Sequence, residues 1–554
     1  NKAVLELSSS DYERDEQQNS VSLTEQGIER LEAKFEVDNL YDNDNIELLS
    51  MISSALLAHY KLKCDVDYIV RDGQILLIDE FTGRIAENRH YPDDLQNAVE
   101  TKEGISPDSR GQILGTIAVQ YFMRIYKRIT GMTGTAVSSK EEFKKLYDLD
   151  VAEIPTHKPC IREVAPMAVY THSEAKWDAV VNEISAANKR GQPVLVGTAD
   201  IVHSEFLAQR LTSIGIKCSV LNAKNDEQEA LLISKAGDFG MVTISTNMAG
   251  RGVDIKLGGE NEENHDKVTG VGGLYVIATV MHESERIDAQ LSGRCARQGD
   301  VGKYRLFVSL EDEIMKTHDI CSLIPAKHYP RHSNEEVTNP VVLRECDRIQ
   351  RIAQGKTFDM RTHLLKYTYI IEEQRKAIFE RRRAILAGES RPNVLVEQDT
   401  ALYELLCSRF GEQEIIDFQR SCLLSLLNRH WAQYTDYTFY LREGIHLTVI
   451  GGKNPIEEFN IAVEEAYQNM QQSILDDVIK QCEVLLEQDS IESAASSAIT
   501  APSATWTYLM DDSGNQFSRL PVIIKSLLGD DEGNDKKFLN SSGFFSKVSK
   551  WFKD

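Results

Sequence analysis

The chain has 554 residues, of which 42% are hydrophobic, and this is enough for roughly three or four domains with buried cores. Its formal net charge of -24 at pH 7 argues against a dedicated nucleic-acid-binding protein, which usually carries a basic domain. No run of about 18 apolar residues predicts a membrane span, and nine scattered cysteines without a CxxC pair indicate buried thiols in a reducing compartment.

The N-terminal part of the chain predicts a small α+β unit. Residues 1–20 are polar and are expected to be irregular, and the capping box SLTE at residues 22–25 predicts the start of a helix. Two apolar runs, at residues 68–70 and 75–78, flank an Asp-Gly pair, which is typical of a β-hairpin.

Residues 87–155 contain a helical pattern followed by a segment of small residues. Apolar residues at four-residue spacing predict a helix over residues 111–128. The sequence GMTGTA at residues 131–136 follows, and its small residues would let a neighbouring backbone approach closely. By itself this segment is more typical of an ordinary turn.

Residues 156–325 alternate between strand and helix patterns, which predicts a parallel α/β sheet. Strands are expected at residues 194–197, 219–221 and 241–245, with helices at residues 204–213 and 227–236. The last of these strands leads into the glycine-rich loop TNMAGRGVD at residues 246–254. Ligands of open parallel sheets bind beyond the carboxyl ends of the strands, where this loop begins.

A second polar segment, QLSGRCARQGD at residues 290–300, follows about forty residues later. Arg294 and Arg297 lie three apart, which would place both guanidinium groups on one face of a helix ending near Gly299. Two forked cations on a rigid element suit a polyphosphate whose charge grows during transfer. Taken singly, the loop could be only a turn and the arginines only a solvated helix face.

The second half of the chain is helical in pattern. A long amphipathic helix is predicted over residues 335–386, which Gly355 could interrupt. Two further helices flank a loop at residues 444–455. Residues 488–535 have the composition of a linker, and the aromatic and lysine-rich end at residues 543–553 could touch a membrane surface or dock on the protein itself.

The two polar segments resemble motifs V and VI of the SecA family of preprotein translocase motor ATPases. The sequences MHESERID at residues 281–288 and SLEDE at residues 309–313 fit the neighbouring segments of that family, and the resemblance runs from near residue 20 to about residue 490. It implies a multidomain α/β plus α protein, with a RecA-like parallel α/β motor domain, a small α+β substrate clamp and a long-helix scaffold. The implied domains are a preprotein cross-linking clamp (1–86), the remainder of a first nucleotide-binding domain (87–155), a second RecA-like domain (156–325), a scaffold, wing and two-helix finger (326–489), and a linker and tail (490–554).

The same resemblance assigns roles to particular residues. It implies arginine fingers at Arg294 and Arg297, and nucleotide contacts at Asp300, Gly250, Arg251 and Asp254. Thr133, Gly134 and Thr135 would form motif III, which couples nucleotide state to domain movement. The implied ligand is ATP with Mg²⁺, with no metal site of the chain's own. The implied partners are unfolded preproteins, a SecY-type membrane channel and an anionic membrane surface, with no specific nucleic acid, and a homodimer is left open. The implied location is the cytoplasm with peripheral membrane association, or a plastid equivalent.

The chain departs from the family pattern at several positions. Ile450 stands where an aromatic residue is frequent, Val253 where threonine is usual, and Cys295-Ala296 where Ser-Gly is usual, which suggests a divergent or accessory-type member. A phosphate-binding GxxxxGK[ST] loop is absent from the 554 residues, as is an acidic Walker B match. The sequence therefore predicts the C-terminal two thirds of such a motor, inactive in ATP hydrolysis without an N-terminal motor segment.

Two other functions stay open from the sequence. One is a non-catalytic protein-binding module that uses only the clamp and the scaffold. The other is a nucleic-acid helicase, because motif VI is shared in outline with that class, although the acidic composition argues against it.

Overall fold

The computed structural model describes most of the chain, and the following account is limited to that part. The described residues are 1–15, 20–40, 45–79, 85–86, 89–91, 93–106, 115–221, 229–246, 254–259, 261–445, 454–488 and 509–510.

A parallel sheet forms the centre of the motor-like domain. Its strand order is β10-β11-β9-β12-β13-β7, and β8 also pairs with β13, with every described pairing parallel. The strands are β7 (Glu163–Val164), β8 (Ala168–Tyr170), β9 (Val194–Thr198), β10 (Ser219–Leu221), β11 (Val242–Thr246), β12 (Leu274–Ala278) and β13 (Gly302–Ser309). The parallel α/β prediction is confirmed, and all residues of β9, β11 and β12 are buried, as expected of strands covered on both faces.

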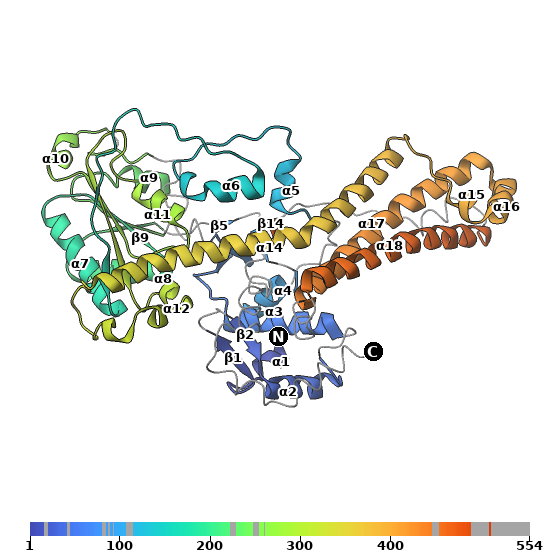
Figure 1. Cartoon of the computed structure of the whole chain (residues 1–554), viewed down its shortest axis with the longest axis horizontal. Helices are drawn as coiled ribbons and strands as arrows, with labels where there is room; N and C mark the ends of the chain where they lie inside the picture. Colours follow the sequence, from blue (N-terminus) through green and yellow to red (C-terminus); the bar gives the residue numbers. More distant parts are fainter. Residues whose placement is uncertain are drawn as a thin grey trace.

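Helices cover the two faces of this sheet. On one face, α7 (Ser173–Lys189) and α8 (Ile201–Ser213) pack through residues such as Trp177 and Leu207. On the other face, α9 (Glu229–Ser234), α10 (His265–Gly270) and α11 (Glu285–Ser292) contribute Ile233, Val268 and Leu291. The arrangement is the three-layer order of an α/β domain (Figure 1).

The N-terminal unit is more ordered than its polar composition predicts. Residues expected to be irregular form α1 (Lys2–Leu5) and the antiparallel pair β1 (Tyr12–Asp15) and β2 (Ser20–Leu23). They do so because Val4 and Leu7 are buried in a small core with Leu31 and Leu40. The unit continues through α2 (Glu25–Phe35), α3 (Ile46–Tyr60), β3 (Tyr68–Arg71), β4 (Gln74–Ile78), β5 (Ile85–Ala86), β6 (Arg89–His90) and α4 (Asp93–Lys102).

Two local predictions for this unit have different outcomes. The hairpin is confirmed: β3 and β4 pair antiparallel, and Asp72 and Gly73 both have positive φ, as a two-residue hairpin turn requires. The predicted N-cap, Ser22, is wrong by two residues. The cap of α2 is Thr24, whose Oγ1 accepts from the amide of Gly27 at 3.3 Å, whereas Ser22 lies in β2.

The segment between the clamp-like unit and the sheet contains less helix than predicted. In the described part of residues 111–128, only α5 (Val119–Arg124) is helical, and residues 115–118 are extended coil. Residues 131–136 lead into the short 3-10 helix η2 (Val137–Ser139) and α6 (Lys140–Tyr147).

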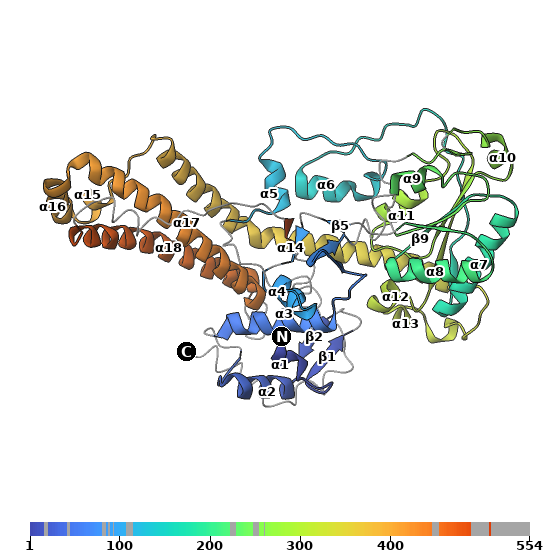
Figure 2. The ribbon, with the colours of Figure 1, turned by 180° about the vertical axis from the view of Figure 1, so that it is seen from behind.

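The helical arm is built on one very long helix. Helix α14 (Pro340–Leu386) runs for 47 residues from the sheet domain into the arm (Figures 1 and 2). It is continuous through Gly355, so the interruption considered from the sequence is not present. Its first half packs with α12 (Glu313–Thr317) and α13 (Ile320–Leu323), which are followed by the 3-10 helix η4 (Ala326–His328).

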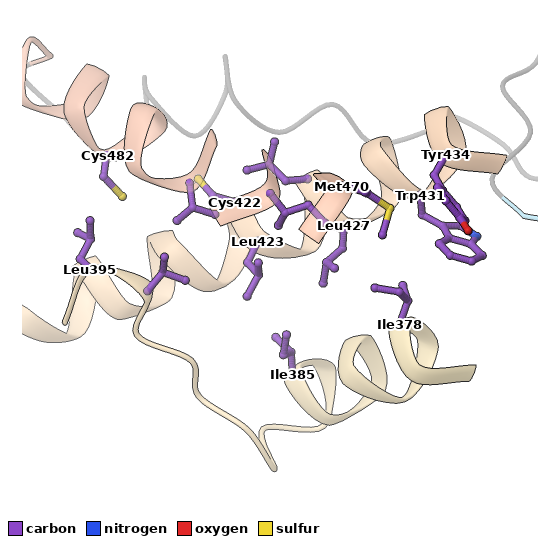
Figure 3. Packing of buried hydrophobic residues seen from close by; sticks show 14 of the residues in the cluster. Ile378, Ile385, Leu395, Cys422, Leu423, Leu427, Trp431, Tyr434, Met470 and Cys482 are labelled. Carbon is purple, nitrogen blue, oxygen red and sulfur yellow. The ribbon is translucent and has the colours of Figure 1, made fainter. Parts of the chain in front are cut away.

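The second half of α14 packs against two other long helices. These are α17 (Glu412–Gly444) and α18 (Pro455–Leu486), joined to α14 through α15 (Val394–Gln398) and α16 (Thr400–Phe410). Figure 3 shows their shared core, with Ile378 and Ile385 of α14 facing Leu427 and Trp431 of α17. The predicted pair of helices is confirmed, while Ile450 and the rest of residues 446–453 lie outside the described residues.

A short strand, β14 (Leu509–Met510), pairs in parallel with β6, and the tail at residues 543–553 lies outside the described part. Among the helices that the structure describes, none combines the length and apolar character needed to cross a membrane.

Candidate nucleotide-contacting site

The arginine segment follows α11 but does not continue it. Helix α11 ends at Ser292, with Gly293 as its cap, and residues 293–300 form successive turns. The predicted single helix carrying Arg294 and Arg297 on one face is therefore wrong. Ala296, Gln298 and Gly299 all have positive φ, at 53°, 52° and 84°, which a helix cannot accommodate.

Contacts with neighbouring strands explain this turn conformation. The Cys295 side chain is buried, and its Sγ lies 3.4 Å from the carbonyl oxygen of Lys303 in β13. A Cβ on Gly302 would lie only 2.8 Å from the amide nitrogen of Ala296, so the segment passes tightly over the start of β13. Arg162 also donates from Nε and Nη2 to the Cys295 carbonyl, at 3.3 and 3.1 Å. These contacts outweigh the helical spacing of the two arginines.

The Cys295 thiol is unreactive in this environment. Burial raises its pKa to about 11, although the nearby Arg162 opposes that rise. The thiol is therefore protonated at neutral pH and acts as a small apolar core residue.

The structure brings motif V and motif VI residues together. Arg297 donates from Nη1 to Oδ1 of Asp254 at 2.8 Å, and its Nε donates to the Gly293 carbonyl at 3.0 Å. The amide of Asp300 donates to the Arg297 carbonyl at 2.9 Å, and Oδ1 of Asp300 lies 3.8 Å from Nε2 of His265. The side chains of Asp254 and Arg297 are thus in contact although 43 residues of sequence separate them, and Asp300 follows in the same turn.

The two arginines differ in how far they are buried. The Arg297 side chain is 31% exposed, whereas Arg294 is 7% exposed. Gly250 and Arg251, the other two residues expected at this site, lie outside the described residues.

The position of this cluster differs from the expected carboxyl edge of the sheet. The loop leaves β11 at Thr246, its carboxyl end, as predicted. The arginine turns, however, lie at the amino ends of two strands, since Gly302 begins β13 and its nearest neighbours include the carbonyl of Leu274, the first residue of β12. The chain after residue 254 therefore runs back across the face of the sheet that α11 covers.

Thr133, Gly134 and Thr135, which the resemblance expects to couple nucleotide state to movement, form a compact and largely exposed turn. The two threonine hydroxyls lie 3.1 Å apart, and Thr133 Oγ1 accepts from the Thr135 amide at 3.3 Å. A Cβ on Gly134 would meet no described atom within 4 Å, so the close approach inferred from its small size is not observed. The turn leads into η2, which packs against α11.

Residues that sequence reasoning missed surround α11. The guanidinium carbon of Arg286 lies 5.9 Å from the ring centre of Phe143 in α6. On its other side, Asp288 bonds to His282 and to Gln350 of α14, and Arg361 of α14 pairs with Glu142 of α6. No spacing rule could have found these contacts, because all except the one between His282 and Asp288 join segments far apart in the sequence.

The described residues contain no group of three or more His, Cys, Asp or Glu side chains placed to hold a metal ion. The arginine turns supply two guanidinium groups, at Arg294 and Arg297, which suit phosphate oxygens better than Mg²⁺, beside the carboxylates of Asp254 and Asp300. A nucleotide phosphate therefore fits the residues present, and the Mg²⁺ ligands would have to come from elsewhere.

Comparison with known families gives matches along most of the chain. Residues 1–100 match the SecA preprotein cross-linking domain, residues 159–264 and 260–323 match the SecA P-loop domain, and residues 336–410 and 391–484 match the SecA wing and scaffold domain.

Individual relatives match over nearly the whole chain. Protein translocase subunit SecA 2 of Thermobifida fusca is 38% identical over 94% of this chain and 68% of its own length. Protein translocase subunit SecA of Mycobacterium avium is 38% identical over 92% of this chain and 66% of its own. The corresponding protein of Caldicellulosiruptor saccharolyticus is 39% identical, over 85% and 62%. The chain thus spans roughly two thirds of the length of these relatives, and by this similarity it belongs to the SecA family.

Proposed function

We propose that this chain works in an ATP-driven motor that moves unfolded preproteins through a Sec-type membrane channel. The relatives are named protein translocase subunits, and the family models include a preprotein cross-linking domain. The observation that carries the proposal is the contact between Asp254 and Arg297, which come from two separate motifs.

The arginine turns would act on the phosphates of ATP. Arg297 is partly exposed and is held by Asp254 and by the Gly293 carbonyl, so its guanidinium is oriented before a ligand arrives. A cation oriented in advance stabilises the charge that develops on a transferring phosphoryl group without reorganising at that moment. Arg294 would support the same group from its buried position, and Gly250, Arg251 and Asp300 would contact the nucleotide.

The remaining catalytic groups would come from a polypeptide segment that these 554 residues do not contain. No GxxxxGK[ST] loop is present in the sequence, so the phosphate-binding lysine and the Mg²⁺ ligands are assigned to another segment. Exposed apolar side chains on α5 and just after it support a covering body at that place, because exposed apolar surface marks an interaction site. They are Val119, Phe122, Ile125 and Tyr126.

The other parts of the chain would handle the substrate and the membrane. Residues 1–86 would clamp the unfolded preprotein, α17 and α18 would form the finger, and residues 133–135 would couple nucleotide state to movement. A SecY-type channel and an anionic membrane surface would be the partners, with the protein bound peripherally. The five predicted domains, from 1–86 to 490–554, remain part of this proposal.

The test is ATP turnover, measured first on this chain alone and then on the chain mixed with a separately produced N-terminal motor segment. We expect turnover only in the mixture. Arg297→Ala should lower that turnover by about 1,000-fold or more, the range seen for arginine fingers. Arg210→Ala is the matched control, because Arg210 has similar exposure and also pairs with a carboxylate, but lies in α8 on the opposite face of the sheet.

The possible outcomes separate the three functions. Equal turnover in the Arg297→Ala and Arg210→Ala mixtures would overturn the finger assignment. No turnover in either preparation, with unfolded peptide still bound, would favour a binding module. Turnover stimulated by RNA or DNA rather than by preprotein would favour a helicase.

A further inference from the structure

Helix α11 is tied to the long helix α14 by a compact set of hydrogen bonds. Nδ1 of His282 lies 2.5 Å from Oδ1 of Asp288, so the imidazole donates to the carboxylate. Gln350 of α14 donates from Nε2 to Oδ2 of Asp288 at 2.6 Å and to the carbonyl of His282 at 2.9 Å. We call these three residues the α11–α14 clasp.

The clasp fixes geometry because its groups are largely removed from water. The side chains of His282 and Asp288 are 9% and 13% exposed, and Gln350 is half-buried. A carboxylate in such a place needs partners for both oxygens, and here one comes from each side. The single amide nitrogen of Gln350 contacts both the helix and the segment before it, so it holds α11 in one rotational setting relative to α14.

The orientation of α11 relative to α14 determines the position at which the arginine turns begin. Asp288 stands six residues before Arg294 and nine before Arg297, and α11 ends only four residues after Asp288. Less than one turn after Asp288, Leu291 packs so closely on β9 that a Cβ on Gly197 would lie 2.5 Å from Leu291 Cδ2. The helix therefore contacts both the sheet and α14 through neighbouring side chains, and a rotation of either moves the start of the turns.

The opposite end of α14 has a comparable buried contact. Gln374 donates to Glu464 of α18 at 3.1 Å and accepts a hydrogen bond from the Tyr434 hydroxyl of α17. Since α14 is unbroken between Gln350 and Gln374, it joins the arginine turns to the two arm helices as one rigid element.

We propose that Gln350 is a positioning residue, which acts through Asp288 and α11 to place Arg294 and Arg297 for ATP hydrolysis. This inference rests on the proposed function of the arginines. It assigns to α14 the role of regulating that same site: a displacement of the helical arm changes the orientation of α11 and hence the rate of turnover.

The test compares two glutamines one turn apart on the same helix. Gln350→Met keeps the length and helix preference of the side chain but removes both hydrogen bonds. Gln354→Met is the matched control, because Gln354 is also half-buried and makes no hydrogen bond within the described part of the chain. Both variants are made in the complete motor, that is, this chain mixed with its N-terminal segment.

A positioning role predicts a particular kinetic pattern. Gln350→Met should lower kcat about tenfold with KM for ATP changed less than twofold, since an interaction that matters only in the transition state is lost. Gln354→Met should match the unchanged protein. Where Gln350→Met does not fold, Gln350→Asn serves instead, because its amide is one methylene too short to reach Asp288.

A double substitution shows whether Gln350 works through the arginines. Arg297→Lys keeps the positive charge but loses the bidentate hydrogen bonding of the guanidinium group. In that background, Gln350→Met should lower kcat less than threefold further. A full tenfold further loss, or equal kcat for the two glutamine variants, would overturn the positioning role. Failure of the proposed function gives a different result. In that case the mixture without substitutions shows no ATP turnover, or Arg297→Ala does not lower it.

Discussion

The sheet domain and the helical arm use glycine in opposite ways. In the sheet domain, Gly273 has a φ of +69° and lies so close to the start of β13 that a Cβ would fall 2.0 Å from the Val301 carbonyl oxygen. In the arm helix α14, Gly355 is exposed, and a Cβ there would meet nothing within 4 Å. The sheet domain therefore depends on close backbone approach, and the arm depends on the periodic burial of side chains.

The largest expected effect is a loss of stability on adding one methyl group to the sheet domain. Gly273→Ala should destabilise that domain by about 3 kcal/mol, because it combines a left-handed backbone with a clash against main-chain atoms that cannot rotate away. For a domain of this size that corresponds to a fall of roughly 10 °C in its thermal transition. Scanning calorimetry of the chain measures the shift.

The matched control lies three residues earlier. Gly270 ends α10, has no left-handed backbone, and offers an added Cβ no neighbour within 4 Å. Gly270→Ala should leave the transition within about 2 °C of its original position. Equal shifts for the two variants would show that loss of glycine, rather than close approach at Gly273, governs stability here.

The opposite sign is expected in the arm. Gly355→Ala should stabilise α14 by about 0.5–1 kcal/mol, since alanine has the higher helix propensity and the position is open to solvent. Urea unfolding followed by circular dichroism detects the gain as a higher midpoint with an unchanged slope. A lowered midpoint would mean that Gly355 has a role in flexibility or contact that its open surroundings do not reveal.

This contrast also explains what the sequence could predict about the fold. Strands β9 and β11 are predicted correctly because fully buried strands give continuous apolar runs, whereas β12, equally buried, is not among the strands that the sequence analysis predicts. The course of α14 was found from its periodicity, but the effect of Gly355 was overestimated. One exposed glycine costs only about 1 kcal/mol in a helix, and Ile349 and Ala353, both buried, hold the flanking turns in place.

One contact at the candidate site was predictable, and the local geometry was not. The resemblance to SecA motifs groups Asp254 with Arg297, and the structure brings these two side chains into contact, while their role at a nucleotide stays a prediction. The helix predicted through Arg294 and Arg297 failed because local spacing carries no information about Cys295 packing on β13. Gln350 could not be found at all, since its partner Asp288 lies 62 residues away.

A pH-dependent effect is expected where the two regions meet. His318 follows α12 in the sheet domain, and its Nδ1 is 3.2 Å from Nζ of Lys356 in α14. Burial, together with the positive charge of Lys356, lowers the pKa of His318 to about 4. Between about pH 6.5 and pH 4 the unfolded chain therefore binds a proton that the folded chain does not. Acidification through this window must destabilise the fold, because the neutral imidazole is the form that accepts a hydrogen bond from Lys356.

His318→Gln removes the titratable imidazole, so the thermal transition temperature should fall less between pH 7 and pH 5. His157→Gln, at an exposed histidine, should leave the original dependence of thermal stability on pH unchanged. If all three proteins lose stability equally over that range, His318 is already charged in the fold, and the contact between α12 and α14 does not depend on a neutral imidazole.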